Sequence, residues 1–215
     1  MSQAPPELRL GDWRAVLADV EQVDAVICDP PYGVRTHAGN ADAMTDMGRR
    51  ALDYAAWSPL HVAQFVASWA PRCLGWFACM TDTELIPVWQ RAFRTAGLYD
   101  FAPVVIVSHR VRLSGDGPAS SAVYLMVARP RSVTYSRWGA LPGWYRAPID
   151  RNGHIGGKPL DLMRALVRDY TRPGDLIADP CAGYGTTLRA AVIEGRRAIG
   201  AEIDPDTHAK AVERL

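Results

Sequence analysis

At 215 residues and 23.6 kDa, the chain is the size of one α/β domain and can bury a substantial core. Its 48% hydrophobic and 22% charged residues describe an ordinary soluble globule, and a net charge of +1 does not by itself indicate a nucleic-acid-binding protein. Neither a signal peptide nor an apolar run long enough to span a bilayer is present. We therefore expect a cytoplasmic protein without membrane contact.

The charge is unevenly distributed along the chain. Between Ser108 and Lys158, eight basic residues stand against two acidic ones, a local balance of +6 that leaves about −5 elsewhere. This asymmetry favours a surface that faces a polyanion, although an arginine-rich solvated surface would give the same count. The basic residues are Arg110, Arg112, Arg129, Arg131, Arg137, Arg146, Arg151 and Lys158.

The four cysteines show no close pairing of the kind that binds zinc or closes a disulfide. Cys28 and Cys79 lie in apolar, strand-like runs, so we expect buried free thiols in a reducing cytosol. No metal site is predicted.

The first elements of the chain lead to a buried strand. Leu8–Leu10 is predicted as a short strand, and Trp13–Val20 has apolar residues at helical spacing. Val23–Cys28 is an apolar β-forming run that indicates a parallel strand buried on both faces. Asp12 follows the first strand and would lie beside Asp29 if the two strands are neighbours. A capping role for Asp12 at the turn is equally compatible with the sequence.

The buried strand ends in Asp29-Pro30-Pro31-Tyr32. The prolines cannot donate ladder hydrogen bonds, so they take the chain out of the sheet. We expect the Asp29 carboxylate, the Pro30 carbonyl and the Tyr32 ring to project from the carboxyl edge of the sheet, where open α/β sheets bind ligands. Two oxygens beside an aromatic ring suit a flat ring that carries an exocyclic amine. A proline turn capped by an aspartate is the alternative reading.

A long loop is predicted after this motif, from Gly33 to Ala56. Loops of this length often act as lids or binding segments. Arg35, His37, Arg49 and Arg50 could contact phosphate there. A plain mobile loop would have the same composition.

The middle of the chain alternates helices and strands. We predict helices at Leu60–Ala70 and Thr83–Ala96, and strands at Leu74–Met80, Phe101–Ser108 and Ala122–Ala128. The Gly/Pro/Ser linker between the last two strands favours an antiparallel pair.

Trp138 and Trp144 follow in a Gly/Pro-punctuated segment among arginines. Core packing is the usual fate of tryptophan. Stacking on extruded or single-stranded bases is the alternative for these two rings.

The last third of the chain begins with an amphipathic helix, Leu160–Tyr170, directly after Lys158-Pro159. A turn leads into the strand Leu176–Ala178, which is followed by Asp179-Pro180-Cys181-Ala182-Gly183-Tyr184-Gly185-Thr186-Thr187. Strand, acid, glycine loop and then helix is the layout that places a ligand against backbone amides at a helix N-terminus.

The predicted helix Thr187–Glu194 is followed by a strand, Ala198–Ile203, and one more short helix. Glu202 lies about 20 residues past the glycines, where a nucleoside-binding unit carries its ribose-binding acid. The third glycine of a dinucleotide fingerprint is missing, because Leu188 stands in its place.

Together these stretches resemble the amino-methylating, S-adenosylmethionine-dependent DNA methyltransferases. That family carries Asp-Pro-Pro-Tyr at its catalytic site and a loop similar to Asp-Pro-Phe-x-Gly-Ser-Gly-Thr-Thr at its cofactor. Here the catalytic motif comes first and the cofactor loop last, which resembles the permuted, β-type order, and Lys158-Pro159 resembles that group's Lys-Pro element. Cys181 stands where Phe is usual and Tyr184 where Ser is common.

The resemblance implies a single-domain, Rossmann-like class I methyltransferase fold over residues 1–215. This α/β fold has a mainly parallel sheet with an antiparallel hairpin. No separate recognition domain is expected, and residues 33–56 and 108–157 are expected to face DNA. Arg35, His37, Arg49, Arg50, Arg110, Arg112, Arg137 and Arg146 are the candidate DNA-binding residues.

The resemblance also implies roles at the site. Asp29 and the Pro30 carbonyl would bind the amine of a flipped base, with Pro31 shaping the turn and Tyr32 stacking on the base. S-adenosyl-L-methionine would be held by the cofactor loop, with Asp12 at its adenine, Glu202 at its ribose, and Lys158 and Thr186 or Thr187 at its carboxylate. The implied cofactor residues are Asp12, Cys28, Asp29, Lys158, Asp179, Pro180, Cys181, Ala182, Gly183, Gly185, Thr186, Thr187, Glu202 and Ile203.

Asp29 favours adenine N6 over cytosine N4, because the first motif residue is more often Ser in the cytosine enzymes. RNA adenine methylation and a catalytically silent nucleic-acid-binding relative remain alternatives, and a nicotinamide-dependent oxidoreductase is the weakest. DNA is the expected partner in a bacterial or phage-infected cell, and the sequence leaves a homodimer open. It also leaves open a restriction–modification, orphan or phage role.

Overall fold

The computed structural model describes residues 5–36, 55–112, 120–133, 138–148 and 157–215, with residues 109–112 and 120 described for their backbone alone. The strands are β1 (Glu7–Leu10), β2 (Val23–Cys28), β3 (Cys73–Thr81), β4 (Tyr99–Asp100), β5 (Val104–Arg112), β6 (Ser120–Arg129), β7 (Trp144–Ala147), β8 (Leu176–Asp179) and β9 (Arg197–Glu202). The helices are α1 (Trp13–Val16), α3 (Pro59–Trp69), α4 (Ile86–Thr95), α5 (Leu160–Tyr170), α6 (Thr186–Ile193) and α7 (Pro205–Val212).

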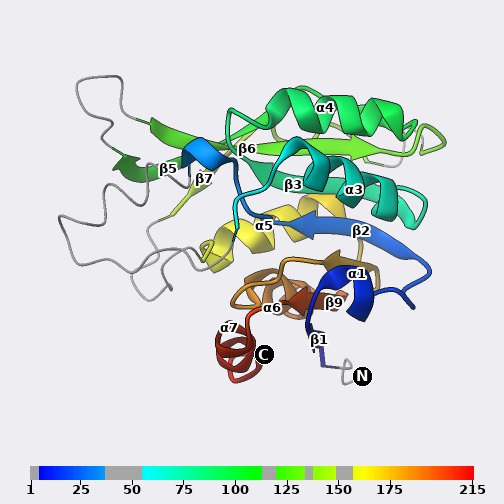
Figure 1. Cartoon of the computed structure of the whole chain (residues 1–215), viewed down its shortest axis with the longest axis vertical. Coiled ribbons are helices and arrows are strands. Elements are labelled where there is room, and N and C mark those ends of the chain that lie inside the picture. Colours follow the sequence, from blue (N-terminus) through cyan, green and yellow to red (C-terminus); the bar gives the residue numbers. More distant parts are fainter. Residues whose placement is uncertain (1–4, 37–54, 113–119, 134–137, 149–156) are drawn as a thin grey trace.

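All these strands form one sheet in the order β1-β9-β8-β2-β3-β6-β5-β7, with β4 paired to β6 (Figure 1). Every neighbouring pair from β1 to β3 is parallel, and so is β5 with β7. β6 runs antiparallel to β3, β4 and β5. The fold is therefore a mixed α/β fold with a mostly parallel sheet, and the predicted antiparallel pair is confirmed.

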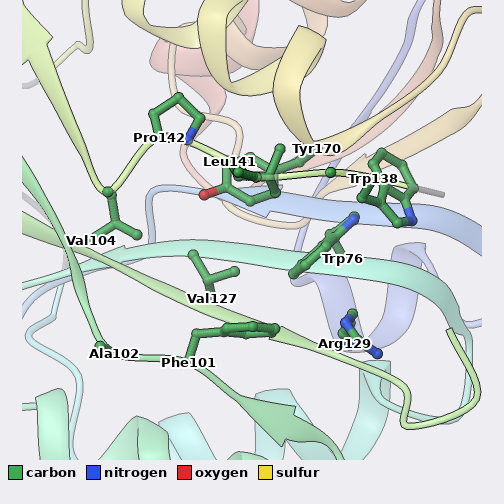
Figure 2. Close-up of a pocket in the computed structure, with 13 residues that line it drawn as sticks. Trp76, Phe101, Ala102, Val104, Val127, Arg129, Trp138, Leu141, Pro142 and Tyr170 are labelled. Atoms are coloured by element: carbon green, nitrogen blue, oxygen red, sulfur yellow. The ribbon is translucent and has the colours of Figure 1, made fainter. Parts of the chain in front are cut away.

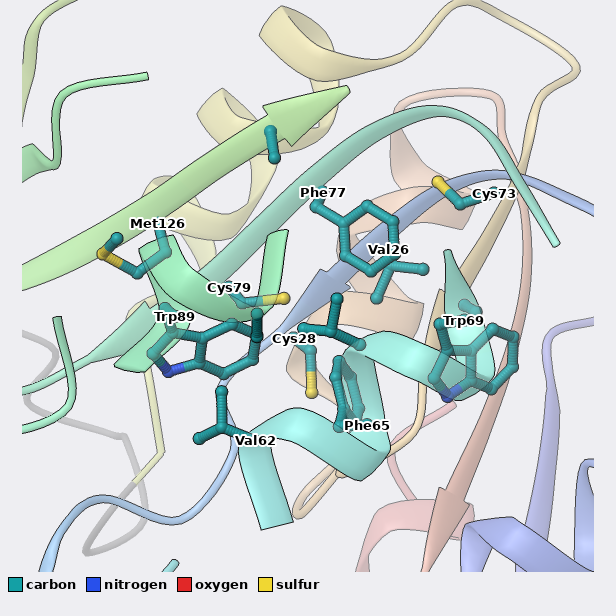
Figure 3. Close-up of a cluster of buried hydrophobic side chains, with 14 of the residues drawn as sticks. Val26, Cys28, Val62, Phe65, Trp69, Cys73, Phe77, Cys79, Trp89 and Met126 are labelled. Carbon is teal, nitrogen blue, oxygen red and sulfur yellow. The ribbon is translucent and has the colours of Figure 1, made fainter. Parts of the chain in front are cut away.

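The sheet is covered on both faces, as the apolar runs of its central strands predict. Alternate residues of β2 point to opposite faces: Val26 and Cys28 join a cluster with residues of α1, α3 and α4 (Figure 3). Ala25 and Ile27 join a second cluster with residues of α5 and α6. Cys28, Cys73 and Cys79 are buried as free thiols, as expected, and Cys181 is a half-buried one.

β2 and β8 are neighbours in the sheet although they lie at opposite ends of the sequence. Ala25 pairs with Ile177 and Val26 with Ala178. The Leu176 N–H donates to the Asp24 carboxylate at 2.7 Å, which fixes the register where both strands begin. Because the strands are parallel, their carboxyl ends meet at the same edge of the sheet.

One sequence-based prediction about the first elements is wrong, and the condition attached to another is not met. The helix expected over Trp13–Val20 ends at Val16, where the chain turns toward β2. Asp12 and Asp29 do not follow neighbouring strands, because β9 and β8 lie between β1 and β2. The conditional expectation that the two acids lie side by side therefore fails.

The segment 108–157, expected to supply loops, contains the end of β5, all of β6 and the unpredicted β7. An apolar pocket of about 300 Å³ lies beside β6, and Trp138 lines it together with Trp76, Phe101 and Tyr170 (Figure 2). The Trp138 ring meets Trp76 edge to face at 5.7 Å, so the core-packing reading holds for Trp138. Trp144, on β7, is 59% exposed.

Within the described residues, no helix has the length and apolar character needed to cross a membrane.

Candidate functional site

The Asp29-Pro30-Pro31-Tyr32 motif lies at the carboxyl end of β2, as predicted. The Tyr32 hydroxyl donates to Asp29 Oδ1 at 2.9 Å, and the Lys158 ammonium donates to Asp29 Oδ2. The same ammonium lies 5.2 Å from the centroid of the Tyr32 ring. The side chains of Lys158 and Asp29 are 20% and 22% exposed, so this cluster lies at the border between core and solvent.

The chain that leaves this motif is anchored by Asp82, directly after β3. Asp82 Oδ2 accepts from the Gly33 N–H at 2.8 Å and from the Thr36 hydroxyl at 2.5 Å. Its Oδ1 accepts from the Leu85 N–H at 3.2 Å. A Cβ on Gly33 would come within 2.4 Å of Glu84 Oε2, so any other residue here would have to displace the Glu84 carboxylate. Asp82 therefore holds the motif against the neighbouring strand.

Asp179 ends β8 and is 2% exposed. Burial raises the pKa of its carboxyl to about 6, and the nearby Asp29 carboxylate acts in the same direction. Hydrogen bonds from Thr187, Cys28 and the Cys181 N–H oppose this rise. Burial also raises the pKa of the Cys28 thiol well above its usual value, so this thiol stays protonated.

The glycine loop turns tightly between β8 and α6. Gly183 and Gly185 have φ angles of +52° and +73°, which residues other than glycine rarely adopt. The Gly183 N–H donates to Glu202 Oε2 at 2.8 Å, and the Asp204 N–H donates to Glu202 Oε1 at 2.9 Å. A Cβ on Gly183 would meet no atom within 4 Å, so the outer side of this loop is open.

The remaining predicted cofactor residues lie around this loop. Pro180 and Ala182 are buried, and Cys181 and Thr186 are half-buried. Thr187 is 4% exposed and bonds to Asp179, and the contact of Thr186 or Thr187 with the cofactor carboxylate stays a prediction. Ile203, next to Glu202, is 63% exposed.

Asp12 lies at the same carboxyl edge of the sheet, but beside the end of β9 and not beside Asp29. The Gly11 N–H donates to the Glu202 carbonyl at 2.8 Å, which brings the end of β1 against the end of β9. Asp12 caps α1 by accepting from the Arg14 N–H at 2.9 Å. The capping alternative is thus observed. Its adenine contact stays a prediction.

The candidate DNA-binding residues are only partly described. Arg35 is exposed beside the motif, and its N–H donates to Glu84 at 3.2 Å. Arg146 is exposed on β7. Arg110 and Arg112 belong to β5 by their backbone, and His37, Arg49, Arg50 and Arg137 lie outside the described residues.

Two features of the site were missed by sequence reasoning. Asp82 follows a buried strand, which is the one signal that could have drawn attention to it. Lys158 was expected at the cofactor carboxylate, and the structure places its ammonium on Asp29. Among the described residues, no cluster of His, Cys, Asp or Glu could hold a metal ion.

Comparison with known proteins agrees with this geometry. A family model described as DNA methylase matches residues 88–213, more than half of the chain. YubD of Escherichia coli (strain K12), described as a methylase, is 37% identical over 219 residues, which cover 95% of this chain and 88% of YubD. The chain therefore belongs to the DNA methylase family, whose members methylate amino groups at adenine N6 or cytosine N4.

Solved structures show the same fold. The M1.HpyAVI–SAM complex has a TM-score of 0.69 at 20% identity, over 97% of this chain and 99% of that one. The cytosine-N4-specific PvuII DNA methyltransferase has a TM-score of 0.73 at 15% identity, over 100% of this chain and 87% of that one. At these identities the likeness shows the class I methyltransferase fold and leaves the target base open.

Proposed function

We propose that the chain transfers a methyl group from S-adenosyl-L-methionine to the exocyclic amine of a base in DNA, with adenine N6 as the target. The observation that carries this proposal is the pairing of β2 with β8. It brings the Asp29 motif and the Asp179 loop together at one edge of the sheet, although 150 residues of sequence separate them.

The residues around the glycine loop fit this cofactor. The ligand is a cation with a ribose diol, an adenine ring and an amino-acid carboxylate. Asp179 and Glu202 offer negative charge on adjacent strands, the outer side of Gly183 is open, and Ile203 presents an exposed apolar side chain beside Glu202. When bound, the cofactor supplies an electrophilic methyl group.

The chain's own residues prepare the nucleophile. The lone pair of an exocyclic amine is delocalised into its ring, so the nitrogen is a poor nucleophile. Hydrogen bonds from the amine to Asp29 and to the Pro30 carbonyl favour a tetrahedral nitrogen with a localised lone pair, and the Tyr32 ring orients the base. A base in duplex DNA must rotate out of the stack to reach this site.

Asp29 also supports adenine over cytosine, because the cytosine enzymes more often begin the motif with Ser. The fold shared with the cytosine-N4-specific PvuII enzyme keeps cytosine as the second candidate. For the DNA contacts we propose residues 33–56, which follow the Asp29 motif directly, and residues 108–157, which make up most of the Ser108–Lys158 segment with its local charge of +6.

The test is modified-base sequencing of DNA from methylation-deficient cells that express the chain, compared with cells that express Asp29→Ala. We expect N6-methyladenine with the parent chain and none with the variant. Calorimetry should show that Asp29→Ala still binds the cofactor. N4-methylcytosine would replace the adenine assignment, and equal loss of cofactor binding would remove Asp29 from its proposed role.

A further inference from the structure

Both oxygens of the Asp29 carboxylate already have partners inside the protein. Oδ1 accepts from the Tyr32 hydroxyl and Oδ2 accepts from the Lys158 ammonium. The Lys158 ammonium also faces the Tyr32 ring at 5.2 Å. A target amine under the proposed function needs these same two groups, the carboxylate and the ring. The Lys158 ammonium therefore engages groups that the target base would need.

This contact opposes entry of a base. The Lys158 ammonium is attracted to the Asp29 carboxylate by opposite charge as well as by the hydrogen bond, whereas a neutral target amine offers the hydrogen bond alone, so the amine does not displace Lys158 on equal terms. Lys158 also neutralises Asp29 next to a second acid, because Asp29 lies close enough to Asp179 to raise the pKa of that carboxyl. To leave Asp29, the Lys158 ammonium needs another anion as its partner.

The position is suited to such an exchange. Lysine carries a compact point charge on a flexible four-carbon stem, whereas arginine holds a carboxylate through a fixed fork. The chain contains 24 Lys and Arg residues, of which only Lys158 and Lys210 are lysines. The amino-acid carboxylate of S-adenosyl-L-methionine is an anion that the proposed reaction brings to this edge.

We propose that Lys158 is a positioning residue that occupies Asp29 until the cofactor carboxylate draws it away, so that the cofactor must bind before the base. The inference rests on the proposed function. Its consequence is positive coupling between the two ligands: the carboxylate takes up Lys158, and the Asp29 oxygen becomes available to the amine.

The presence of only two lysines allows a direct test by NMR. Protein labelled at lysine Cε and Nζ should give two side-chain signals, which Lys210→Met assigns. S-adenosylhomocysteine retains the amino-acid carboxylate, and 5′-deoxy-5′-methylthioadenosine lacks it. We expect the first to shift the Lys158 signal toward its position in Asp29→Asn, and the second to leave it unchanged although calorimetry shows that it binds.

Binding of S-adenosylhomocysteine without movement of the Lys158 signal would overturn the inference and leave the proposed function intact. Equal movement with both nucleosides would overturn it too. Absence of any binding would remove the proposed function, and the inference with it.

A second measurement uses DNA affinity. S-adenosylhomocysteine should tighten binding of the parent chain to unmethylated bacterial genomic DNA by about fivefold, a typical coupling between two sites. In Lys158→Met this ratio should fall to about one, and in the control Lys210→Met it should persist. A ratio that Lys158→Met leaves unchanged would make the Lys158–Asp29 pair a purely structural contact.

Discussion

Asp179 shows how one buried carboxyl links stability to function. Its pKa in the folded protein is about 6, above the ordinary value of 3.8, because burial disfavours its charged form. The folded state therefore binds the proton of the Asp179 carboxyl more tightly than the unfolded state does. The resulting stability is present below about pH 4 and is lost as pH rises through 6, a difference of at most ~3 kcal/mol. A cationic ligand would offset that loss.

We therefore expect Asp179→Asn to unfold at a higher temperature than the parent chain near about pH 8, and at a similar temperature near about pH 4. The amide carries no charge, so it avoids the cost of ionisation in the core. Thermal unfolding across this pH range measures the effect, with the exposed Asp206→Asn as the control. A difference that does not vary with pH would contradict this account. Cofactor binding should weaken in Asp179→Asn near about pH 8, where the carboxyl of the parent chain carries its charge.

At the scale of elements, the site depends on how the chain leaves β2. Asp82 receives three hydrogen bonds, two of them from residues that follow the motif. Removing the carboxylate leaves these donors unsatisfied and releases the segment that positions Tyr32.

Asp82→Ala should lower methyl transfer at least tenfold while cofactor affinity remains near that of the parent chain. Asp82→Asn, which retains one acceptor oxygen, should recover part of the rate. Single-turnover methyl transfer and calorimetry separate the two effects. If cofactor affinity falls as much as the rate, Asp82 supports the whole edge of the sheet and not the motif alone.

The elements themselves were largely readable from the sequence. The Val23–Cys28 strand and the Leu160–Tyr170 helix have the bounds that their apolar patterns predict. β7 was missed because Trp144–Ala147 is a four-residue strand at the end of the sheet with no apolar run around it. Short edge strands are defined by their pairing, which local patterns do not contain.

In the site, too, local motifs could be predicted and long-range contacts could not. The Asp29 motif and the glycine loop were found because each is a contiguous stretch with its own chemistry. The Lys158–Asp29 contact joins residues that lie 129 positions apart, and Asp82 meets Gly33 across 49. Such contacts follow from strand order, which sequence spacing does not specify.

At the scale of the whole molecule, a net charge of +1 conceals a basic segment on an otherwise acidic chain. DNA affinity should therefore fall with salt, because binding releases counterions from phosphates. If Arg146 contacts one phosphate, Arg146→Ala should reduce the slope of log affinity against log salt by about 1. Arg91→Ala, an exposed arginine on α4, should leave the slope unchanged. Titrations over a salt series measure both, and equal slopes for parent and Arg146→Ala would exclude that contact.

The pairing of β2 with β8 also affects when the protein can fold during its synthesis. A ribosome synthesises β2, which Asp29 follows, early in the chain. It adds the neighbouring strand β8 only after most of the chain has been made. Bringing such distant segments together is entropically expensive and slow. Nascent chains that stop before Leu176 contain Asp29 but lack the Asp179 loop. Methyl transfer therefore becomes possible only when the last parallel strands dock.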